Sequence, residues 1–220
     1  MPVEIVDKGE GNRVELHPWF EKSGRLKIVF SGNGNLVRIP EPPRDCNGMV
    51  IQLGENCVVD IGAACGLSNS FIFAARDGEV RIGARCSFTA RTRFIMHEAS
   101  CIRLGWDCMI AADVQFMTSD NHTIYSLETG QRTNPAADIE IGDHVWIGLQ
   151  CIVVKGGRIG SGSVIGLRSV VTDSIPRNCL AVGTPARVLR TDVGWDRKLW
   201  RKDNSAETRQ LPDSAEPLLP

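Results

Sequence analysis

Apolar residues recur with a period of six along the middle of the chain. Between residues 141 and 171 every sixth position is aliphatic, in the series Ile141, Ile147, Val153, Ile159, Ile165 and Val171. An α-helix repeats about every 3.6 residues and a lone strand about every 2, so neither explains this period. Hexapeptide repeats are typical of a parallel β-helix. The pattern therefore predicts an all-β fold in which each hexad forms a short strand and a corner.

The same pattern predicts how far the β-helix extends. Aliphatic-glycine pairs also occur upstream, at Leu53-Gly54, Ile61-Gly62, Ile82-Gly83 and Leu104-Gly105. We expect a β-helix over residues 36–190, with bulges or short insertions at residues 74–79 and 96–100, where the register weakens. Residues 123–138 carry no hexad and are expected to form a long loop excursion. Loops of this length in a compact domain are commonly functional or disordered.

The two ends of the chain have a different composition. Residues 1–35 contain an alternating segment, RLKIVF, followed by the turn sequence SGNGN, and are expected to form an N-terminal cap or irregular first coil. Residues 191–220 are expected to begin with a short helix, in which Trp195 and Trp200 pack over the last coil. The polar, proline-containing remainder is expected to be disordered.

The composition predicts a single domain that belongs to neither the nucleic-acid-binding nor the membrane-spanning class. The chain has 220 residues, 42% of them hydrophobic, and a net charge of −1, which shows no bias toward nucleic acid or anionic membrane. No apolar stretch approaches the roughly 20 residues of a membrane span, and the N-terminus lacks a signal-peptide core. The eight cysteines include no CxxC pair and mostly occupy the small position of a hexad. We expect them to be reduced core residues of a cytoplasmic protein.

Three segments carry a resemblance to a known family. They are TSDNHTIY (118–125), DIEIGDHVWIGLQCIVVKGGRIGSGSVIGLRSVVTDSIP (138–176) and AVGTPARVLR (181–190). In this order they resemble the hexapeptide-repeat acyltransferases, closest to the O-acetyltransferases of sugars, capsule and lipopolysaccharide, including the maltose and galactoside enzymes. The resemblance implies a left-handed parallel β-helix, whose hand the period itself does not distinguish. It also implies acetyl-CoA as acyl donor, no required metal, and a homotrimer with active sites at subunit interfaces.

Acetyl transfer to an alcohol needs a base that removes the hydroxyl proton, and histidine suits this role near neutral pH. The resemblance assigns the role to His122, which stands where the hexads stop; otherwise His122 is a turn residue. We expect Asp120 to orient its ring, with Glu128 or a backbone carbonyl as alternatives. His144 lies within a hexad and is read as structural, whereas His17 and His97 lack supporting context.

The resemblance also implies the residues that bind acetyl-CoA. Trp146 is expected to project outward, where it lines the cofactor groove or packs in the trimer. Arg187 and Arg190 match a basic pair that holds CoA phosphates, although Arg190 can also be a solvated tail charge. Asp173 departs from the lysine usual at its position, which removes one phosphate contact. The remaining expected contacts are Gly148, Leu149, Gly166, Leu167 and Thr172.

The acceptor is indicated by two arginines in the segment SFTARTRF. Arg91 and Arg93 fall near the coil that faces the acceptor pocket in the resembled enzymes, where asparagine is usual. They suggest an acidic acceptor, such as a sialic or uronic acid or a phosphate-bearing carrier. The alternative is a solvated face with ion pairs to Glu79 or Glu98.

The function that these features favour is O-acetylation of a surface polysaccharide or its precursor. N-acylation of an amino-sugar nucleotide and acetylation of a drug are alternatives within the same fold. A γ-carbonic-anhydrase-like zinc enzyme needs two histidine ligands five residues apart, and His97, His122 and His144 contain no such pair. A non-catalytic scaffold is the remaining alternative, and the long loop followed by Trp146 argues against it.

Overall fold

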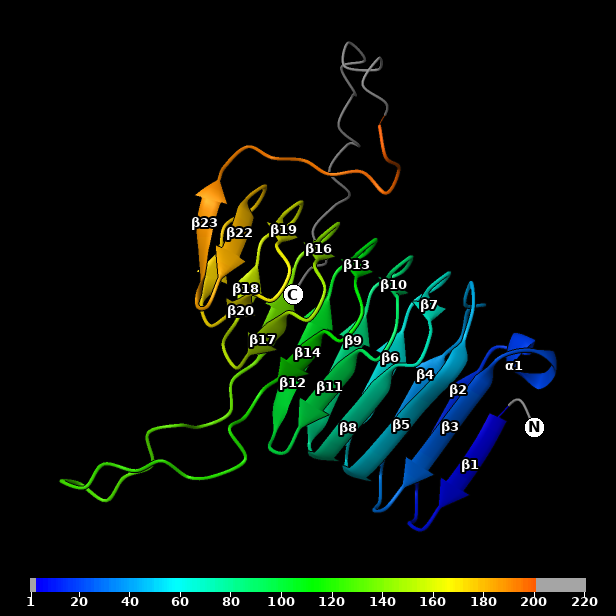
Figure 1. Ribbon diagram of the computed structural model, residues 1–220. Helices are drawn as coiled ribbons and strands as arrows, with labels where there is room; N and C mark the ends of the chain where they lie inside the picture. Colours follow the sequence, from blue (N-terminus) through cyan, green and yellow to red (C-terminus); the bar gives the residue numbers. More distant parts are fainter. Residues whose placement is uncertain (1–2, 201–220) are drawn as a thin grey trace.

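The structure, a computed structural model, describes residues 3–200 and has three parallel β-sheets wound into one solenoid. From β5 (Asn47–Glu55) to β22 (Leu180–Gly183) successive strands belong to sheets A, B and C in turn, so the chain winds around a three-sided prism (Figure 1). The expected all-β parallel β-helix is therefore confirmed. Within residues 3–200 the one α-helix is α1 (Trp19–Lys22), and no helix has the length and apolar character needed to cross a bilayer.

Each sheet is a ladder of strands from successive coils. Sheet A contains β1 (Val3–Asp7), β3 (Arg25–Phe30), β5 (Asn47–Glu55), β8 (Phe71–Arg76), β11 (Arg93–Met96), β14 (Gln115–Met117), β17 (Ile152–Val154) and β20 (Val170–Val171). Sheet B contains β2 (Arg13–Leu16), β4 (Leu36–Ile39), β6 (Val58–Ile61), β9 (Gly78–Ile82), β12 (Ser100–Leu104), β15 (Ile139–Ile141), β18 (Arg158–Ile159) and β21 (Ser174–Ile175). Sheet C contains β7 (Gly66–Leu67), β10 (Ser87–Phe88), β13 (Met109–Ile110), β16 (Trp146–Ile147), β19 (Val164–Ile165), β22 (Leu180–Gly183) and β23 (Ala186–Arg190).

The six-residue period places its aliphatic residues in the core. Ile141, Ile147 and Val153 are buried on sheets B, C and A in turn, and they pair with Ile159, Ile165 and Val171 of the next coil. One coil in this half of the solenoid is thus 18 residues long, or three hexads. Burying these ladders against one another supplies the main favourable term in folding.

Coils nearer the N-terminus are longer, which explains their weaker hexad register. Sheet A pairs Phe71 with Arg93 and Arg93 with Gln115, residues 22 positions apart. The additional residues lengthen the strands: β8 and β9 are separated by Asp77 alone, in a left-handed conformation with φ +45°. The short insertions expected at residues 74–79 and 96–100 are thus the residues that lengthen these coils, and the ladders keep their register there without a bulge.

The solenoid also begins earlier than the sequence predicts. Strands β1 and β2 pair in register with β3 and β4, so two sides of the first coil are regular, whereas its third side has a helix in place of a strand. Inward-facing Ile28 and Phe30 continue the core. Helix α1 follows β2, at the point of this first coil where later coils have their sheet C strand, and it buries Phe20.

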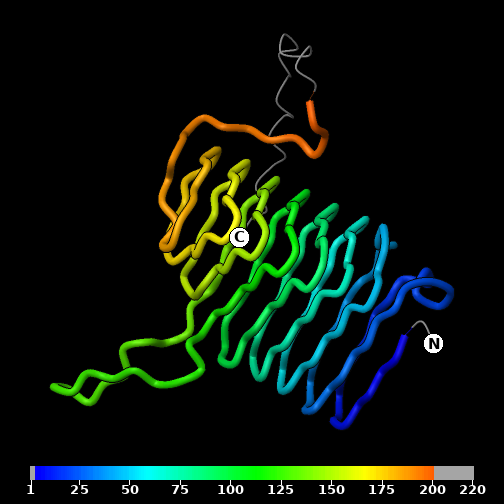
Figure 2. Tube along the Cα trace, viewed as in Figure 1, coloured from blue at the N-terminus to red at the C-terminus, as the bar shows by residue number. Residues whose placement is uncertain are grey.

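The C-terminal segment differs from its prediction too. Strand β23 turns back antiparallel to β22, and residues 191–200 then run without a helix over the outside of the solenoid (Figure 2). Side chains of this segment bond to coil corners, which fixes it in an extended path. The expected disordered tail lies outside the described residues.

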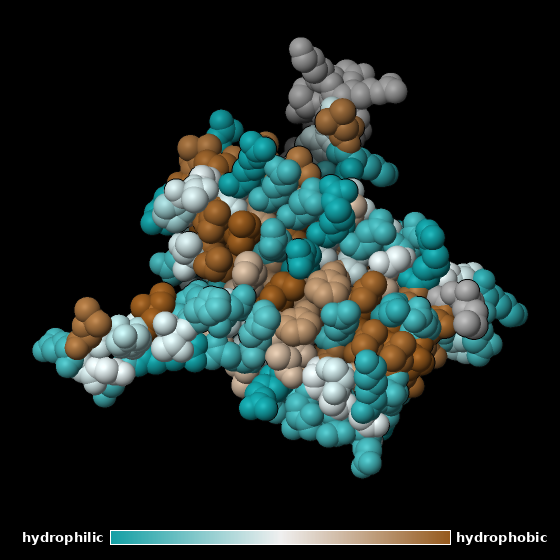
Figure 3. All heavy atoms as spheres, turned by 60° about the horizontal axis from the view of Figure 1, so that its bottom comes forward, coloured by the Kyte–Doolittle hydropathy of each residue, from teal (hydrophilic) through white to brown (hydrophobic). Residues whose placement is uncertain are grey.

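Two outer faces of the prism differ in character. Sheet B carries a charged ladder in which Arg38 pairs with Asp60, and Arg81 and Arg103 both pair with Glu79. Figure 3 looks onto a face where hydrophobic atoms gather in a band between hydrophilic rims. The outward positions of sheet A supply such residues, among them Phe71, Phe73, Ile95, Met117 and Ile152.

All eight cysteines are buried free thiols. Burial raises the pKa of Cys46 to about 11 and that of Cys101 to about 12. A thiol with a raised pKa carries little of the reactive thiolate at neutral pH. The cysteines therefore act as small core residues, as the sequence predicts.

Candidate active site

A long arm leaves the prism at the corner between sheets A and B. It spans residues 118–138, between β14 and β15, and projects from the solenoid (Figures 1 and 2). Its outer part is an antiparallel hairpin closed by the Tyr125–Arg132 bridge. Arg132 also makes a double ion pair with Glu98 at the corner. The excursion predicted from the missing hexads is thus an arm with its own hairpin and an ion pair to the prism.

Asn134 organises the base of this arm, and sequence reasoning missed it. Its side chain is buried, donates to the His122 carbonyl (2.8 Å) and to Asp120 Oδ2 (2.9 Å), and accepts the Ile124 N–H (2.7 Å). A single asparagine outside any hexad gives no recognisable signal. These three bonds fix the backbone on both sides of His122.

His122 lies at the start of the arm with an exposed side chain. The chain leaves the repeat earlier than expected, because β14 ends at Met117 and the buried Thr118 and Ser119 already belong to the arm. His122 is therefore clear of the inward position that counting by six assigns to it. Its imidazole makes no hydrogen bond to another residue in the described part of the chain, so it is available to an incoming hydroxyl.

Asp120, expected to orient His122, is engaged elsewhere. It accepts hydrogen bonds from Lys155 Nζ (2.6 Å) and Asn134 Nδ2 (2.9 Å). The Lys155 hydrogen bond, aided by Asn134, holds the pKa of Asp120 below its usual range. Asp120 thus anchors the arm to the next coil, and its link to the His122 ring is not made in this structure. The alternative, Glu128, is exposed near the far end of the hairpin.

A hollow of about 360 Å³ lies on the outer face of sheet A beside the arm. Asn121, the neighbour of His122, lines it together with aromatic and polar residues of three adjacent strands. The Arg93 guanidinium sits over the Phe71 ring at 5.7 Å, and His97 packs against Phe73 at 5.0 Å. Aromatic side chains with a guanidinium over one ring can hold a sugar that bears an acidic group.

The two arginines predicted for the acceptor have different positions. Arg93 lines the hollow, whereas Arg91 forms a double hydrogen bond to Asp113 at a coil corner (2.6 and 2.7 Å). Arg91 is thus part of a solvated ion pair. This resembles the alternative interpretation of a solvated face, but the partner is Asp113. The expected partners Glu79 and Glu98 instead pair with Arg81 and Arg132. His97, which the sequence left without context, does line the hollow.

The residues expected to contact the acyl donor follow sheet C and the corner between sheets C and A. Trp146 on β16 projects outward and is 38% exposed. Leu149 and Leu167 occupy equivalent corner positions on successive coils and are 44% and 67% exposed. An exposed leucine on each of two adjacent coils, beside an exposed indole, forms an apolar strip along the edge of the prism.

Gly148 and Gly166 shape this edge by allowing coils to approach closely. A Cβ on Gly148 would lie 2.7 Å from the Leu167 nitrogen, and a Cβ on Gly166 would lie 2.6 Å from Val182. Arg187 and Arg190 are exposed on β23, near the end of the same sheet. Thr172 is exposed at the corner between sheets A and B, apart from the leucines. The structure therefore groups the expected donor contacts, with Thr172 as the outlier.

Comparison with known proteins was made on sequence and on structure, and no family model matches the chain. It is 30% identical over 189 residues to the putative lipopolysaccharide biosynthesis O-acetyl transferase WbbJ of Escherichia coli, covering 80% of this chain and 88% of that protein. It is 31% identical to the polysialic acid O-acetyltransferase of Neisseria meningitidis, over 79% of this chain and 70% of that protein. A match to the Escherichia coli polysialic acid O-acetyltransferase, at 35% identity, covers only 41% of that protein. The crystal structure of the polySia specific acetyltransferase NeuO superposes with a TM-score of 0.80 at 30% identity, over 91% of this chain and 92% of that one. The chain belongs to the hexapeptide-repeat acetyltransferase family.

As a member of this family, the chain is an O-acetyltransferase by homology. No cluster of three or more histidine, cysteine, aspartate or glutamate side chains in residues 3–200 is placed to hold a metal ion. The described residues thus offer no site of the three-histidine kind that the carbonic-anhydrase alternative requires.

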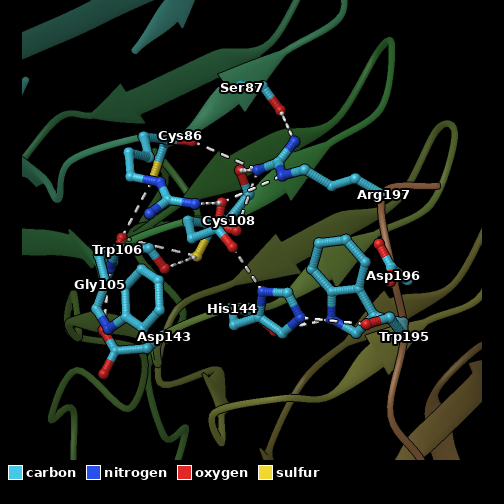
Figure 4. A network of polar contacts seen from close by, with 12 residues as sticks. Cys86, Ser87, Gly105, Trp106, Cys108, Asp143, His144, Trp195, Asp196 and Arg197 are labelled. Carbon is cyan, nitrogen blue, oxygen red and sulfur yellow. Dashed lines mark hydrogen bonds and ion pairs between the residues drawn. The ribbon is translucent and has the colours of Figure 1, made fainter. Parts of the chain in front are cut away.

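His144 of this acetyltransferase lies in a polar network at the corner between sheets B and C (Figure 4). Its Nδ1 is 2.8 Å from Asp107 Oδ2, and its ring stacks on Trp195 at 4.1 Å. Trp195 thus covers one face of the ring, and both nitrogens have protein partners, since Nε2 is 3.3 Å from the Trp195 carbonyl. This agrees with the structural role expected for His144.

Proposed function

We propose that this chain transfers an acetyl group from acetyl-CoA to a hydroxyl of an acidic surface polysaccharide or its precursor, of the capsule or lipopolysaccharide type. The observation that carries the proposal is the hollow beside His122, where Arg93 lies over an aromatic face. Relatives that O-acetylate polysialic acid, an acidic polymer, support the same acceptor class.

In the proposed reaction His122 is the general base. Acetyl-CoA supplies an acyl group already activated as a thioester, so the difficult partner is the neutral alcohol. The His122 imidazole takes the hydroxyl proton as the acceptor oxygen attacks the thioester carbonyl. The C–S bond then breaks, and CoA leaves as the thiol by taking up the proton that the imidazole accepted. A positioned base is worth about 10² to 10⁴ in rate. The Asn134 hydrogen bond to the His122 carbonyl holds that residue in place.

The acyl donor is proposed to lie along the edge formed by Trp146, Leu149 and Leu167. Exposed apolar groups suit the pantetheine chain, and the exposed guanidinium groups of Arg187 and Arg190 suit phosphate oxygens. The strip matches the chemistry of acetyl-CoA, because it is apolar along its length and ends near two positive charges on the last strand.

The working unit is proposed to be a homotrimer, because one chain does not bring the two halves of the site together. His122 leaves the corner between sheets A and B, whereas the donor strip follows the corner between sheets C and A. One side of the prism, about six residues or roughly 20 Å, separates these corners. A neighbouring copy can supply the missing half, and the arm offers it exposed Ile124, Tyr125 and Leu127.

Acetyl-CoA thiol release with a panel of acceptors tests the proposal. The panel contains an acidic polysaccharide, its short fragments, a neutral glycan, an amino-sugar nucleotide and chloramphenicol. We expect acidic glycans to be acetylated on oxygen with the highest kcat/KM. Preferential acetylation of the amine or the drug would assign one of the alternative functions, and no acetyl-CoA binding would favour a scaffold.

The oligomer has its own test. Light scattering should give the mass of three chains. At acetyl-CoA concentrations too low for Trp146→Ala alone to turn over, co-expressed His122→Ala and Trp146→Ala subunits should recover up to about one quarter of wild-type activity, because that share of interfaces receives both intact halves. A fully active monomer would contradict a shared site. Eight free thiols support placement in a reducing compartment such as the cytoplasm.

A further inference from the structure

The segment after β23 is fastened to coils that lie well before it in the chain. Residues 191–200 cross the corner between sheets B and C, where Trp195 and Arg197 reach three successive coils (Figure 4). These contacts join residues 51 to 112 positions apart in sequence. The segment is thus a strap across the side of the solenoid, rather than a cap over its last coil.

Trp195 touches the strand that carries the proposed donor wall. Its indole stacks on His144 with the ring planes 7° apart, and its Nε1–H donates to the His144 carbonyl at 2.8 Å. Its ring centroid also lies 6.1 Å from that of Trp146, at 49°. This separation is within the range of favourable aromatic pairs. Trp195 therefore contacts both the Trp146 ring and the backbone two residues before it.

Arg197 holds Trp195 in this position. Its guanidinium donates to the Asp107 side chain (3.1 Å), to the Cys108 carbonyl (3.1 Å) and to Ser87 Oγ (2.8 Å). Asp107 is nearly buried, with 10% of its side chain exposed, and its other oxygen faces His144 Nδ1. A nearly buried carboxylate that has a hydrogen-bonding partner on each oxygen, the Arg197 guanidinium on one and the His144 ring on the other, fixes the geometry of all three side chains.

Trp146 has few other restraints on its ring. On either side along sheet C it is flanked by Met109 and Val164, which are flexible or small and leave the indole 38% exposed. An exposed aromatic side chain without a partner samples several rotamers. Contact with the fixed Trp195 ring removes part of that freedom before any ligand binds.

We propose that Trp195, held by Arg197, is a positioning residue that fixes the Trp146 indole in the orientation that receives the acyl donor. The inference rests on the proposed function, in which Trp146 lines the acetyl-CoA groove. Preorganising a binding wall lowers the cost of ordering it on binding, so the strap contributes to donor affinity without touching the reacting atoms. The strap thus acts on KM for acetyl-CoA rather than on the chemical step.

Four variants test this role. Trp195→Ala removes the ring, Trp195→Phe keeps an aromatic face but loses the N–H donor, and Arg197→Lys keeps the charge but loses the planar fork. Trp200→Ala is the matched control, because Trp200 lies on the same strap, is 54% exposed and bonds only to Asp196 among the contacts described. Each is assayed for KM and kcat with acetyl-CoA, for acetyl-CoA affinity by calorimetry, and for Tm.

We expect Trp195→Ala to raise KM for acetyl-CoA about fivefold to tenfold with kcat within about twofold, and the control to match wild type. Trp195→Phe and Arg197→Lys should give smaller increases, and they keep the test open if the alanine variant does not fold. In a Trp146→Ala background, Trp195→Ala should have no further effect on KM, because its target is gone. A purely structural strap would lower Tm and leave KM unchanged.

An unchanged KM in Trp195→Ala, or a KM effect that persists in full without Trp146, would overturn the inference. Failure of the proposed function is distinguishable, because the wild-type protein itself would then not bind acetyl-CoA. Trp200→Ala behaving like Trp195→Ala would likewise overturn it, since any disturbance of the strap would then suffice.

Discussion

Replacing Phe116 by alanine tests the inward register on which the whole fold depends. Phe116 is fully buried on β14, and its ring stacks on that of Phe94 in the coil before, with centroids 4.9 Å apart and planes 14° apart. Truncating a buried phenylalanine costs about 3–5 kcal/mol. We place Phe116→Ala in the upper half of this range, because a stacked pair adds about 0.5–1.5 kcal/mol beyond area burial.

For a chain of this length, each kcal/mol shifts Tm by about 2–4 °C, so Phe116→Ala should lower Tm by roughly 8–20 °C. Circular dichroism during heating measures the shift, and urea unfolding checks the free energy. Gln115→Ala is the matched control, because Gln115 is the preceding residue on the same strand and points outward. It should change stability by less than about 0.5 kcal/mol. Equal losses in both variants, or none in either, would refute the register.

Other substitutions test the site and the close approach of coils. Arg93→Gln should raise KM for an acidic acceptor by roughly tenfold or more, because a charged hydrogen bond is lost. KM for a neutral acceptor should not change. Equal effects on both acceptors would contradict an acidic subsite. Gly148→Ala should destabilise the protein by about 1–3 kcal/mol, because its Cβ would meet Leu167 backbone at 2.7 Å, whereas Gly194→Ala, with nothing within 4 Å, should be neutral. Since Lys155 lowers the pKa of Asp120, the pair persists as pH falls and separates only below the carboxyl's usual range. A carboxyl NMR titration should show a lower midpoint than in Lys155→Ala, and equal midpoints would contradict the pairing.

The architecture was predictable where every inward-facing residue must fit the same narrow prism. Ile141, Ile147 and Val153 each fill a narrow prism, and any polar residue there would be buried without partners. The hexad pattern is therefore strict where coils are 18 residues long. It weakens where coils are 22 residues long, because the longer strands β5, β8 and β9 follow ordinary two-residue alternation. The segment RLKIVF shows this alternation, and the prediction of a cap or irregular first coil for residues 1–35 gave it too little weight.

The site was predictable only in part, because its contacts join residues far apart in sequence. The exposed position of His122 and the outward Trp146 follow from where the hexads stop and how little room the prism offers. The Asp120–Lys155 ion pair and the Asn134 bonds depend on how the arm folds back, which no local pattern encodes. The strap also lies where the sequence predicts a short helix. Its extended path is stabilised by a tertiary contact, the hydrogen bond from Arg197 to Asp107, which overrides local helix propensity.

The central claim is that a base on the arm activates the acceptor hydroxyl, and His122→Ala measures it most directly. Acetyl-CoA thiol release with an acidic polysaccharide should fall by about 10² to 10⁴, with the fold and oligomer mass unchanged. His17→Ala is the matched control, since His17 lies in the first coil and accepts the Trp19 N–H at 3.1 Å; it should keep wild-type turnover. A His122→Ala protein that acetylates the polymer at close to the wild-type rate would contradict the account.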